Sequence, residues 1–229
     1  MSRPNDESRA WYRLTREEQA EFHAAGYTRV WGAGAIIAPQ GGPARSMYVI
    51  LRGWVKITVT NDRGENAPIA ARGPGEILGE LATLPGITRT AAIEAVDPVQ
   101  ALVIPSPRAR ALLQRHPHIA EELLRSAALR LQQSDRLRLE AGGPDFAHRL
   151  AAVLVELAHQ CAPDSAANTP VNLPFGQDEL AGFARVSRST LIRGLDELRK
   201  LHLIETARRR TTIPHLQPLR DYATGRANN

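Results

Sequence analysis

Short apolar runs separated by glycine and proline fill the first half of the chain. In order they are Tyr27–Trp31, Ala35–Ala38, Met47–Leu51, Trp54–Thr60, Ile69–Ala71, Thr90–Val96 and Val99–Ile104. Runs of this length and spacing are typical of strands in a small antiparallel roll or barrel. Polar and apolar side chains alternate along Trp54–Thr60, which predicts a half-buried strand, and Asn61–Asn66 after it predicts a hairpin turn.

After Pro117 the spacing of the apolar residues changes from that of strands to that of a helix. Side chains suited to one helix face recur every three or four residues up to about Ala141; they are Ile119, Leu123, Leu124, Ala127, Leu131 and Ser134. A helix of roughly 23 residues is about 35 Å long, which is too long for so small a roll to cover. We therefore expect it to pair with its counterpart in a second subunit, the alternative being that it packs on its own domain. Gly142, Gly143 and Pro144 are expected to end this helix and form a hinge.

A closely spaced helical pair is predicted near the end of the chain, after a helix from about Asp145 to Gln160. Gln177–Ala184 reads as a short amphipathic helix with an acidic first turn. Arg185 and Val186 follow as a tight turn, and Ser187 is a good N-cap for a second helix running to Leu201. The order of these elements predicts a helix-turn-helix.

The second helix of this pair has one apolar side, made by Leu191, Leu195 and Leu198. Arg188, Ser189 and Arg193 project from the opposite side near its start, where a recognition helix meets base edges. Because an arginine can donate two hydrogen bonds to guanine, Arg188 and Arg193 are the best candidates for reading bases. Phosphate contacts are expected from Gln177, Ser187 and Thr190. The alternative is an ordinary helical hairpin with a solvated face.

A strand, a basic turn and a second strand follow the helical pair. The strands are predicted at Leu203–Glu205 and Thr211–Ile213, with Arg208, Arg209 and Arg210 in the turn. This arrangement is typical of a wing, and its arginines would reach a DNA phosphate; a merely solvated hairpin tip is the alternative.

A candidate phosphate cradle lies between two of the predicted strands. Gly79, Glu80 and Leu81 form a turn, and Arg89 with Thr90 follows a short helical insertion. Exposed main-chain N–H groups, an arginine and a hydroxyl can hold a phosphate, and a carboxylate can accept a proton from a ribose hydroxyl. Taken alone, the same residues would suit a surface turn with an ion pair.

Composition and charge narrow the choice of function. A length of 229 residues suits two small domains, and the net charge of +5 arises after residue 107, because residues 1–107 are balanced. No run approaches the ~20 apolar residues of a membrane span, and residues 1–16 lack the apolar run of a signal peptide, so we expect a cytoplasmic protein without a membrane partner. The single cysteine, Cys161, is expected to be a buried, inert thiol, since it cannot form an internal disulfide or hold an iron–sulfur cluster.

An enzyme of the cupin type also uses a small β-roll, but it needs histidine and carboxylate ligands clustered on strands. Here His116 and His118 flank Pro117 at a helix start, and the other histidines lie outside the predicted strands. We expect no metal and no catalytic residue.

In this order, the roll, the cradle, the long helix and the winged helix resemble the cyclic AMP receptor protein/fumarate-nitrate regulator family, from about Tyr12 to Tyr222. The most specific matches are Gly79–Leu81 with Arg89 and Thr90, the segment Tyr48–Gly53, and Ser187–Arg193. The resemblance implies an α+β fold. Its parts are a cyclic-nucleotide-binding β-roll of jelly-roll type at residues 1–116, a dimerisation helix with a hinge at residues 117–143, and a winged helix-turn-helix at residues 144–229.

The resemblance also implies roles for individual residues. Glu80 would bind the ribose 2′-hydroxyl, Arg89 and Thr90 the cyclic phosphate, and Ser134 and Asp135 the base, one of them across the dimer. We expect cyclic AMP as the effector. Asp135 departs from the usual neutral residue and can accept two protons from guanine, so cyclic GMP stays open.

Two departures concern the helix-turn-helix. Ser189 stands where members that read the best-known operator have a glutamate, which predicts a different DNA site. Arg185 stands where many members have glycine in the turn.

The resemblance implies a homodimer on palindromic double-stranded DNA, with RNA polymerase as a further partner if the protein is an activator. Ligand binding would re-set the paired long helices and place two recognition helices about 34 Å apart, one DNA turn. The alternative is a regulator of the same family that responds to another ligand or binds DNA without one.

Overall fold

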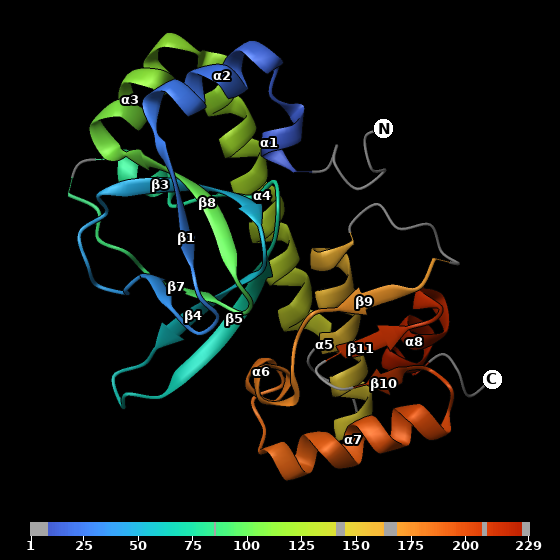
Figure 1. Ribbon diagram of the computed structural model, residues 1–229. Helices are drawn as coiled ribbons and strands as arrows, with labels where there is room; N and C mark the ends of the chain where they lie inside the picture. Colours follow the sequence, from blue (N-terminus) through green and yellow to red (C-terminus); the bar gives the residue numbers. More distant parts are fainter. Residues whose placement is uncertain (1–8, 85, 141–144, 163–168, 208–209, 226–229) are drawn as a thin grey trace. The chain divides into compact units, whose positions relative to one another are not determined.

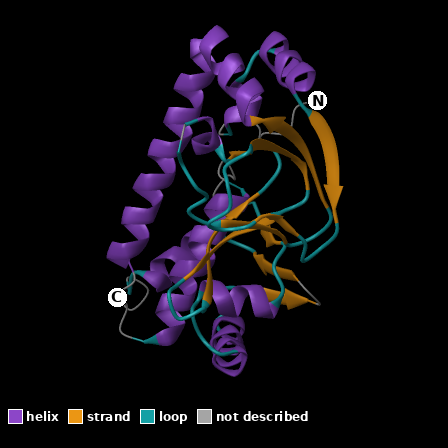
Figure 2. Cartoon of the chain, turned by 90° about the vertical axis from the view of Figure 1, so that its left-hand side faces the viewer, coloured by secondary structure: helices purple, strands orange, loops and turns teal. Residues whose placement is uncertain are grey.

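The computed structural model describes residues 9–84, 86–140, 145–162, 169–207 and 210–225, and within them the side chains of all but 82–83 and 133–140 (Figure 1). The chain divides into two compact units, residues 1–130 and 131–229. Each unit mixes helices with antiparallel sheet, as the colours in Figure 2 show, which confirms the α+β class. Among the described residues, no helix is both long enough and apolar enough to cross a membrane.

Two four-stranded antiparallel sheets form the roll of the first unit. One sheet has the order β1-β8-β3-β6 and the other the order β2-β7-β4-β5. The bounds are β1 Tyr27–Trp31, β2 Ile36–Ala38, β3 Ser46–Arg52, β4 Val55–Thr60, β5 Asn66–Arg72, β6 Ile77–Leu78, β7 Ala92–Ala95 and β8 Val99–Pro105. The expected runs therefore form strands, with small shifts at their ends, whereas the two-residue β6 carried no pattern that predicted it.

Strands β3 and β8 are buried on both faces, which explains why their sequences read as continuous apolar runs. In β3, Tyr48 and Ile50 enter a core that also contains Ile93 and Ala95 of the opposite sheet. Alternate side chains, such as Met47, point the other way into a core beneath the helices. The two faces of β3 thus pack into two different cores.

The predicted alternation along Trp54–Thr60 is wrong in its second half. A bulge between Ile57 and Thr58 shifts the register of β4 against β5, and it turns Thr58 inward, to 6% exposure. A bulge places an extra residue in one strand and bends it, so the strict two-residue period is lost. The predicted hairpin turn is present, with the Gly64 N–H donating to the Asn61 carbonyl.

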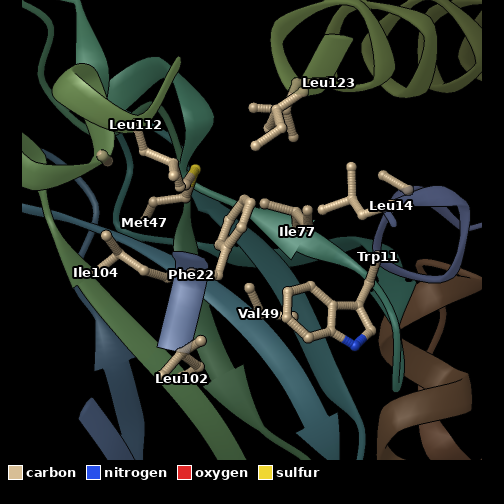
Figure 3. Packing of buried hydrophobic residues seen from close by; sticks show 13 residues of the cluster. Trp11, Leu14, Phe22, Met47, Val49, Ile77, Leu102, Ile104, Leu112 and Leu123 are labelled. Atoms are coloured by element: carbon tan, nitrogen blue, oxygen red, sulfur yellow. The ribbon is translucent and has the colours of Figure 1, made fainter. Parts of the chain in front are cut away.

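Helices cover the outer face of the β3–β8 sheet. They are α1 Ala10–Arg13, α2 Arg16–Ala25 and α3 Ser106–Arg115, followed by the first turns of α4, which spans Pro117–Glu140. Figure 3 shows Phe22 and Trp11 packed against Met47 and Val49 of the sheet. The α2 helix begins at a capping box, in which Thr15 and Glu18 each accept a main-chain N–H of the other. None of α1, α2 and α3 was predicted, whereas the short helical insertion expected before Arg89 is present as a 3₁₀ helix, Glu80–Thr83.

Helix α4 confirms the predicted long helix, but its apolar residues do not share one face. Ile119 and Leu123 are buried in the core of the first unit, at 0% and 5% exposure. Leu124 and Leu131 are instead 72% and 63% exposed. The first turns thus pack on their own domain, while a leucine pair seven residues apart remains uncovered. The hinge expected at Gly142, Gly143 and Pro144 lies outside the described residues.

The second unit is built around α5, Phe146–Cys161, which Asp145 caps by accepting the His148 N–H. The other elements are β9 Val171–Leu173, α6 Gln177–Phe183, α7 Arg188–Lys200, β10 Glu205–Ala207, β11 Arg210–Ile213 and α8 Leu216–Ala223. The three strands form a sheet with the order β10-β11-β9. Cys161 is buried, as expected. The strand predicted at Leu203–Glu205 begins only at Glu205, and neither β9 nor α8 was predicted.

Candidate functional site

A cavity of about 210 Å³ lies inside the roll, beside the predicted phosphate cradle. Most of its wall is apolar, and four charged side chains reach it. The lining residues are Ala44, Ile57, Ile69, Ala70, Arg72, Leu78, Gly79, Glu80, Leu81, Ile87, Thr88, Arg89, Thr90, Ala91, Ile93 and Arg130. The cradle residues that the sequence singled out, Gly79 to Leu81 with Arg89 and Thr90, therefore face one space.

Arg89 is held in place at one end of this cavity. Its guanidinium donates to the main-chain carbonyl of Ser46 at 2.7 Å and lies over the Tyr48 ring, 5.2 Å from the centroid. Its own main chain is tied by two hydrogen bonds to the neighbouring turn at Gly41 and Gly42. The side chain is thus oriented before any ligand arrives, which lowers the entropy cost of binding an anion.

Gly79 allows the close approach that this arrangement needs. Its φ is +72°, in the left-handed region that favours glycine, and it precedes the short 3₁₀ helix Glu80–Thr83. A Cβ atom at this position would lie 2.9 Å from Arg89 Nη1 and 3.2 Å from the Ser46 carbonyl oxygen. The main chain, rather than a side chain, therefore lines the cradle here.

Glu80 does not present an isolated carboxylate. Arg130 of α4 donates to Glu80 Oε1 at 3.1 Å and to the Ile77 carbonyl at 2.8 Å. The same guanidinium lies 3.5 Å from the Glu76 carboxylate. Because each carboxylate oxygen can accept more than one hydrogen bond, Glu80 can still accept a hydroxyl proton while paired.

Sequence reasoning missed Arg130 and Arg72, because neither belongs to a local motif. Arg130 is one of several arginines along α4, and only the folded chain brings it to the turn at Glu80. Of the predicted residues, Leu81 and Thr90 line the cavity with exposed side chains. Ser134 and Asp135 lie on α4, and their side chains are outside those that the structure describes.

The helix-turn-helix of the second unit has the predicted geometry. Ser187 caps α7 by accepting the N–H of Thr190, and its hydroxyl lies 2.9 Å from the hydroxyls of both Ser189 and Thr190. Leu191, Leu195 and Leu198 are buried, as expected. In the turn, Arg185 adopts a φ of +53°, the conformation for which glycine is the usual residue.

The side chains proposed to meet DNA lie on the exposed side of this motif. Arg188, Ser189 and Arg193 are all exposed near the start of α7. The Arg188 guanidinium donates to Gln177 Oε1 at 3.3 Å and lies 3.5 Å from the Asp178 carboxylate. These contacts join the two helices at the face where bases would be read.

The wing lies beside this face. Arg210 is the first residue of β11, rather than part of the turn, and it is exposed. It lines a concave surface of about 460 Å³ together with Gln177 and Arg188. Arg208 and Arg209 lie outside the described residues, so the structure brings together only one of the three wing arginines with the helices.

Within the described part of the chain, no group of three or more histidine, cysteine, aspartate or glutamate side chains is arranged to hold a metal ion. His118 was one of the histidines weighed above as possible metal ligands. Its ring nitrogens lie 2.9 Å from the Glu18 carboxylate and 3.9 Å from the Glu122 carboxylate. The contact with Glu18 joins α2 to α4, whereas Glu122 lies one turn further along α4.

Known proteins share both units. Residues 28–116 match the cyclic nucleotide-binding domain, and residues 148–222 match the Crp-like helix-turn-helix domain. The cyclic AMP receptor protein of Thermus thermophilus is 30% identical over 171 residues, which cover 74% of this chain and 76% of that protein. The CRP-like cAMP-activated global transcriptional regulator of Mycobacterium tuberculosis is 26% identical over 162 residues, 71% of this chain and 72% of that protein. The structure of the Thermus thermophilus catabolite activator protein covers 95% of this chain and 99% of its own, with a TM-score of 0.51 and 26% identity.

Proposed function

We propose, from the premise that this chain belongs to the cyclic AMP receptor protein/fumarate-nitrate regulator family of transcription regulators, that a cyclic nucleotide in the roll controls its binding to DNA. The observation that carries this proposal is the common cavity of Gly79, Glu80, Arg89 and Thr90. It combines an oriented guanidinium, a hydroxyl and a carboxylate, the groups that a cyclic phosphate and a ribose need. Ser134 and Asp135 are proposed to contact the base.

Cyclic AMP is the first candidate, because the Thermus thermophilus and Mycobacterium tuberculosis relatives carry cyclic AMP in their names. Cyclic GMP is the second, because a carboxylate at Asp135 suits guanine. Calorimetric titration of the purified protein with each nucleotide tests the proposal. We expect saturable binding near one ligand per subunit with at least one of them. Absence of heat with both would contradict it and favour a regulator that uses another ligand or none.

We also propose that two chains pair along α4. Leu124 and Leu131 are exposed and seven residues apart, the spacing of a coiled-coil seam, with the small Ala127 and Ala128 between them. Leu129 is also exposed, at 45%, but it lies on a different side of the helix at 100° per residue. Sedimentation should show a dimer that Leu124→Glu with Leu131→Glu disrupts and that Leu129→Glu leaves intact. A monomeric wild-type chain would contradict the pairing.

The DNA-binding surface is proposed to comprise Gln177, Ser187, Arg188, Ser189, Thr190 and Arg193, with wing arginines Arg208, Arg209 and Arg210 on phosphates. The exposed start of α7 supports the base-reading roles of Arg188 and Arg193. In a dimer these surfaces would meet two half-sites of a palindrome. We further propose that the protein is cytoplasmic. If it activates transcription, we expect RNA polymerase to be a partner.

A further inference from the structure

Ile192 is an apolar side chain on the side of α7 that is proposed to read bases. It is 38% exposed, whereas the buried leucines of the same helix, Leu191, Leu195 and Leu198, are at most 3% exposed. A single exposed apolar side chain is ordinary on a protein surface, so its position decides whether it has a role.

The position of Ile192 places it among the proposed base-reading residues. It lies four residues after Arg188 and three after Ser189 in α7. At 100° per residue, it is about 40° from Arg188 and about 60° from Ser189 around the helix axis. Helical side chains lean towards the N-terminus, so Ile192 leans over the turn that contains these two residues. The N-terminal part of a recognition helix is where side chains contact base edges.

The residues on this face offer different chemistry to DNA. Arg188 only donates hydrogen bonds, the Ser189 hydroxyl can donate or accept, and Ile192 does neither. A polar group on a base edge would lose its water against Ile192 without gaining a hydrogen bond, which costs free energy. The group in the major groove that suits an apolar side chain is the 5-methyl group of thymine.

We propose that Ile192 contacts the 5-methyl group of a thymine, so that each half-site of the DNA prefers thymine at one position. The contact distinguishes thymine from cytosine, the other pyrimidine, which lacks the methyl group. The inference rests on the proposed DNA-binding surface and adds a second base type to it, because Arg188 and Arg193 are proposed to read guanine.

Deoxyuridine tests this contact, because it pairs with adenine as thymine does and lacks only the methyl group. The wild-type protein first selects a duplex from a random pool, in the presence of any cyclic nucleotide that it binds. The duplex is then remade with deoxyuridine in place of one thymine at a time. Fluorescence anisotropy should identify one thymine in each half-site at which the replacement weakens binding about fourfold, the effect of burying one methyl group. Ile192→Ala should bind the thymine and deoxyuridine duplexes with equal affinity.

Leu201→Ala is the matched control. Leu201 is also an exposed apolar residue, at 48%, but it lies at the C-terminal end of α7, away from the turn of Arg188 and Ser189. This variant should keep the wild-type response to deoxyuridine. Circular dichroism checks that both variants fold. If Ile192→Ala does not, Ile192→Ser takes its place, since serine also removes the apolar end of the side chain.

The outcomes separate the inference from the proposed function. The inference would be overturned if no thymine responded to replacement. It would also be overturned if the response persisted in Ile192→Ala, because the methyl group would then act through DNA shape or another residue. In both cases the proposed function would stand, since control by a nucleotide and the arginine contacts do not depend on Ile192. A wild-type protein that selects no duplex from the pool would refute the proposed DNA binding, and the inference with it.

Discussion

Arginine serves both proposed binding surfaces of this protein, and the two surfaces hold it differently. Arg89 in the roll is half-buried, donates to the Ser46 carbonyl and lies over the Tyr48 ring. Arg188 on α7 is 62% exposed and makes two longer contacts, to Gln177 and Asp178. The roll presents an oriented cation in a cavity, whereas the helix presents an adjustable one on an exposed face.

This difference follows from what each surface must recognise. A small anion in a cavity is bound best by groups oriented in advance, because few contacts must offset the whole cost of association. A recognition helix meets a large polyanion through many contacts, and its side chains adjust to the bases they meet. Electrostatic contacts are therefore expected to be strong and few in the roll, and weak and many on α7.

The largest expected effect is the loss of nucleotide affinity in Arg89→Ala. A small loss would contradict the contrast between an oriented arginine in the roll and an adjustable one on α7. Removing one partner from a buried charge-assisted contact costs about 2 kcal/mol or more, so cyclic nucleotide affinity should fall at least about thirtyfold in calorimetry. Arg193→Ala, in the other unit, is the matched control and should bind nucleotide like the wild type. Wild-type affinity in Arg89→Ala would refute the assigned phosphate site.

Arg188→Ala tests the other side of the comparison. A bidentate contact to guanine discriminates by about 1–3 kcal/mol, so the variant should lose preference at one base pair of each half-site. Fluorescence anisotropy on a duplex selected from a random pool, and on its single-base variants, measures this loss. Nucleotide affinity should not change. A uniform loss across all sequences would instead assign Arg188 to a phosphate.

Two substitutions compare main-chain strain in the two units. Each unit has a turn residue with a positive φ, Gly79 in the first and Arg185 in the second. Gly79→Ala should lower the free energy of unfolding by about 1–2 kcal/mol, since φ is +72° and the new Cβ would contact Arg89. Arg185→Gly should raise it by about 1 kcal/mol or less, because relief of strain at φ +53° is offset by a more flexible unfolded chain. Urea unfolding followed by circular dichroism measures both. The same sign for both variants would show that the turn in the second unit is not strained.

The smallest expected effect concerns pH and distinguishes the roll from the helix-turn-helix. The Glu18 carboxylate, and then Glu122 and Glu121, raise the pKa of His118. Burial alone would raise the pKa of Glu18, but the hydrogen bonds from the Thr15 N–H and His118 outweigh it and lower that pKa. Charged His118 therefore stabilises the first unit below the ordinary histidine pKa, and this contribution disappears as pH rises through the raised value.

Tryptophan fluorescence follows the first unit alone, because the three tryptophans, Trp11, Trp31 and Trp54, all lie there. The urea midpoint by fluorescence should fall slightly between pH 6 and pH 8. His118→Gln should reduce this fall, and a pH response unchanged by the substitution would exclude the His118–Glu18 pair as its source.

The two units also differ in how much of their structure could be predicted from the sequence. The caps and periodicity of α7 are local, so Ser187, the leucine stripe and the exposed arginines could all be predicted from a few neighbouring residues. The bulge at Thr58 and the two-residue strand β6 depend on the pairing of distant strands, so no local period reveals them. Periodicity also could not separate Leu123 from Leu124, because only packing decides which leucine the roll covers.

The cradle lies between these cases. Its motif could be recognised, but its surroundings could not. Arg130 is fifty residues from Glu80 in the sequence. Arg72 lies at the end of β5, whereas Arg89 precedes β7. Buried polar groups gain their partners through tertiary structure, so the charge balance of the cavity is a property of the fold and not of the motif.

DNA affinity of the intact protein, with and without saturating cyclic GMP or cyclic AMP, tests the central claim most directly. Anisotropy on the selected duplex should show an affinity increase of about fivefold or more with the nucleotide that binds, as expected for two coupled sites. Arg89→Ala should retain the ligand-free DNA affinity and lose the increase. Saturable nucleotide binding that leaves DNA affinity unchanged would contradict the account.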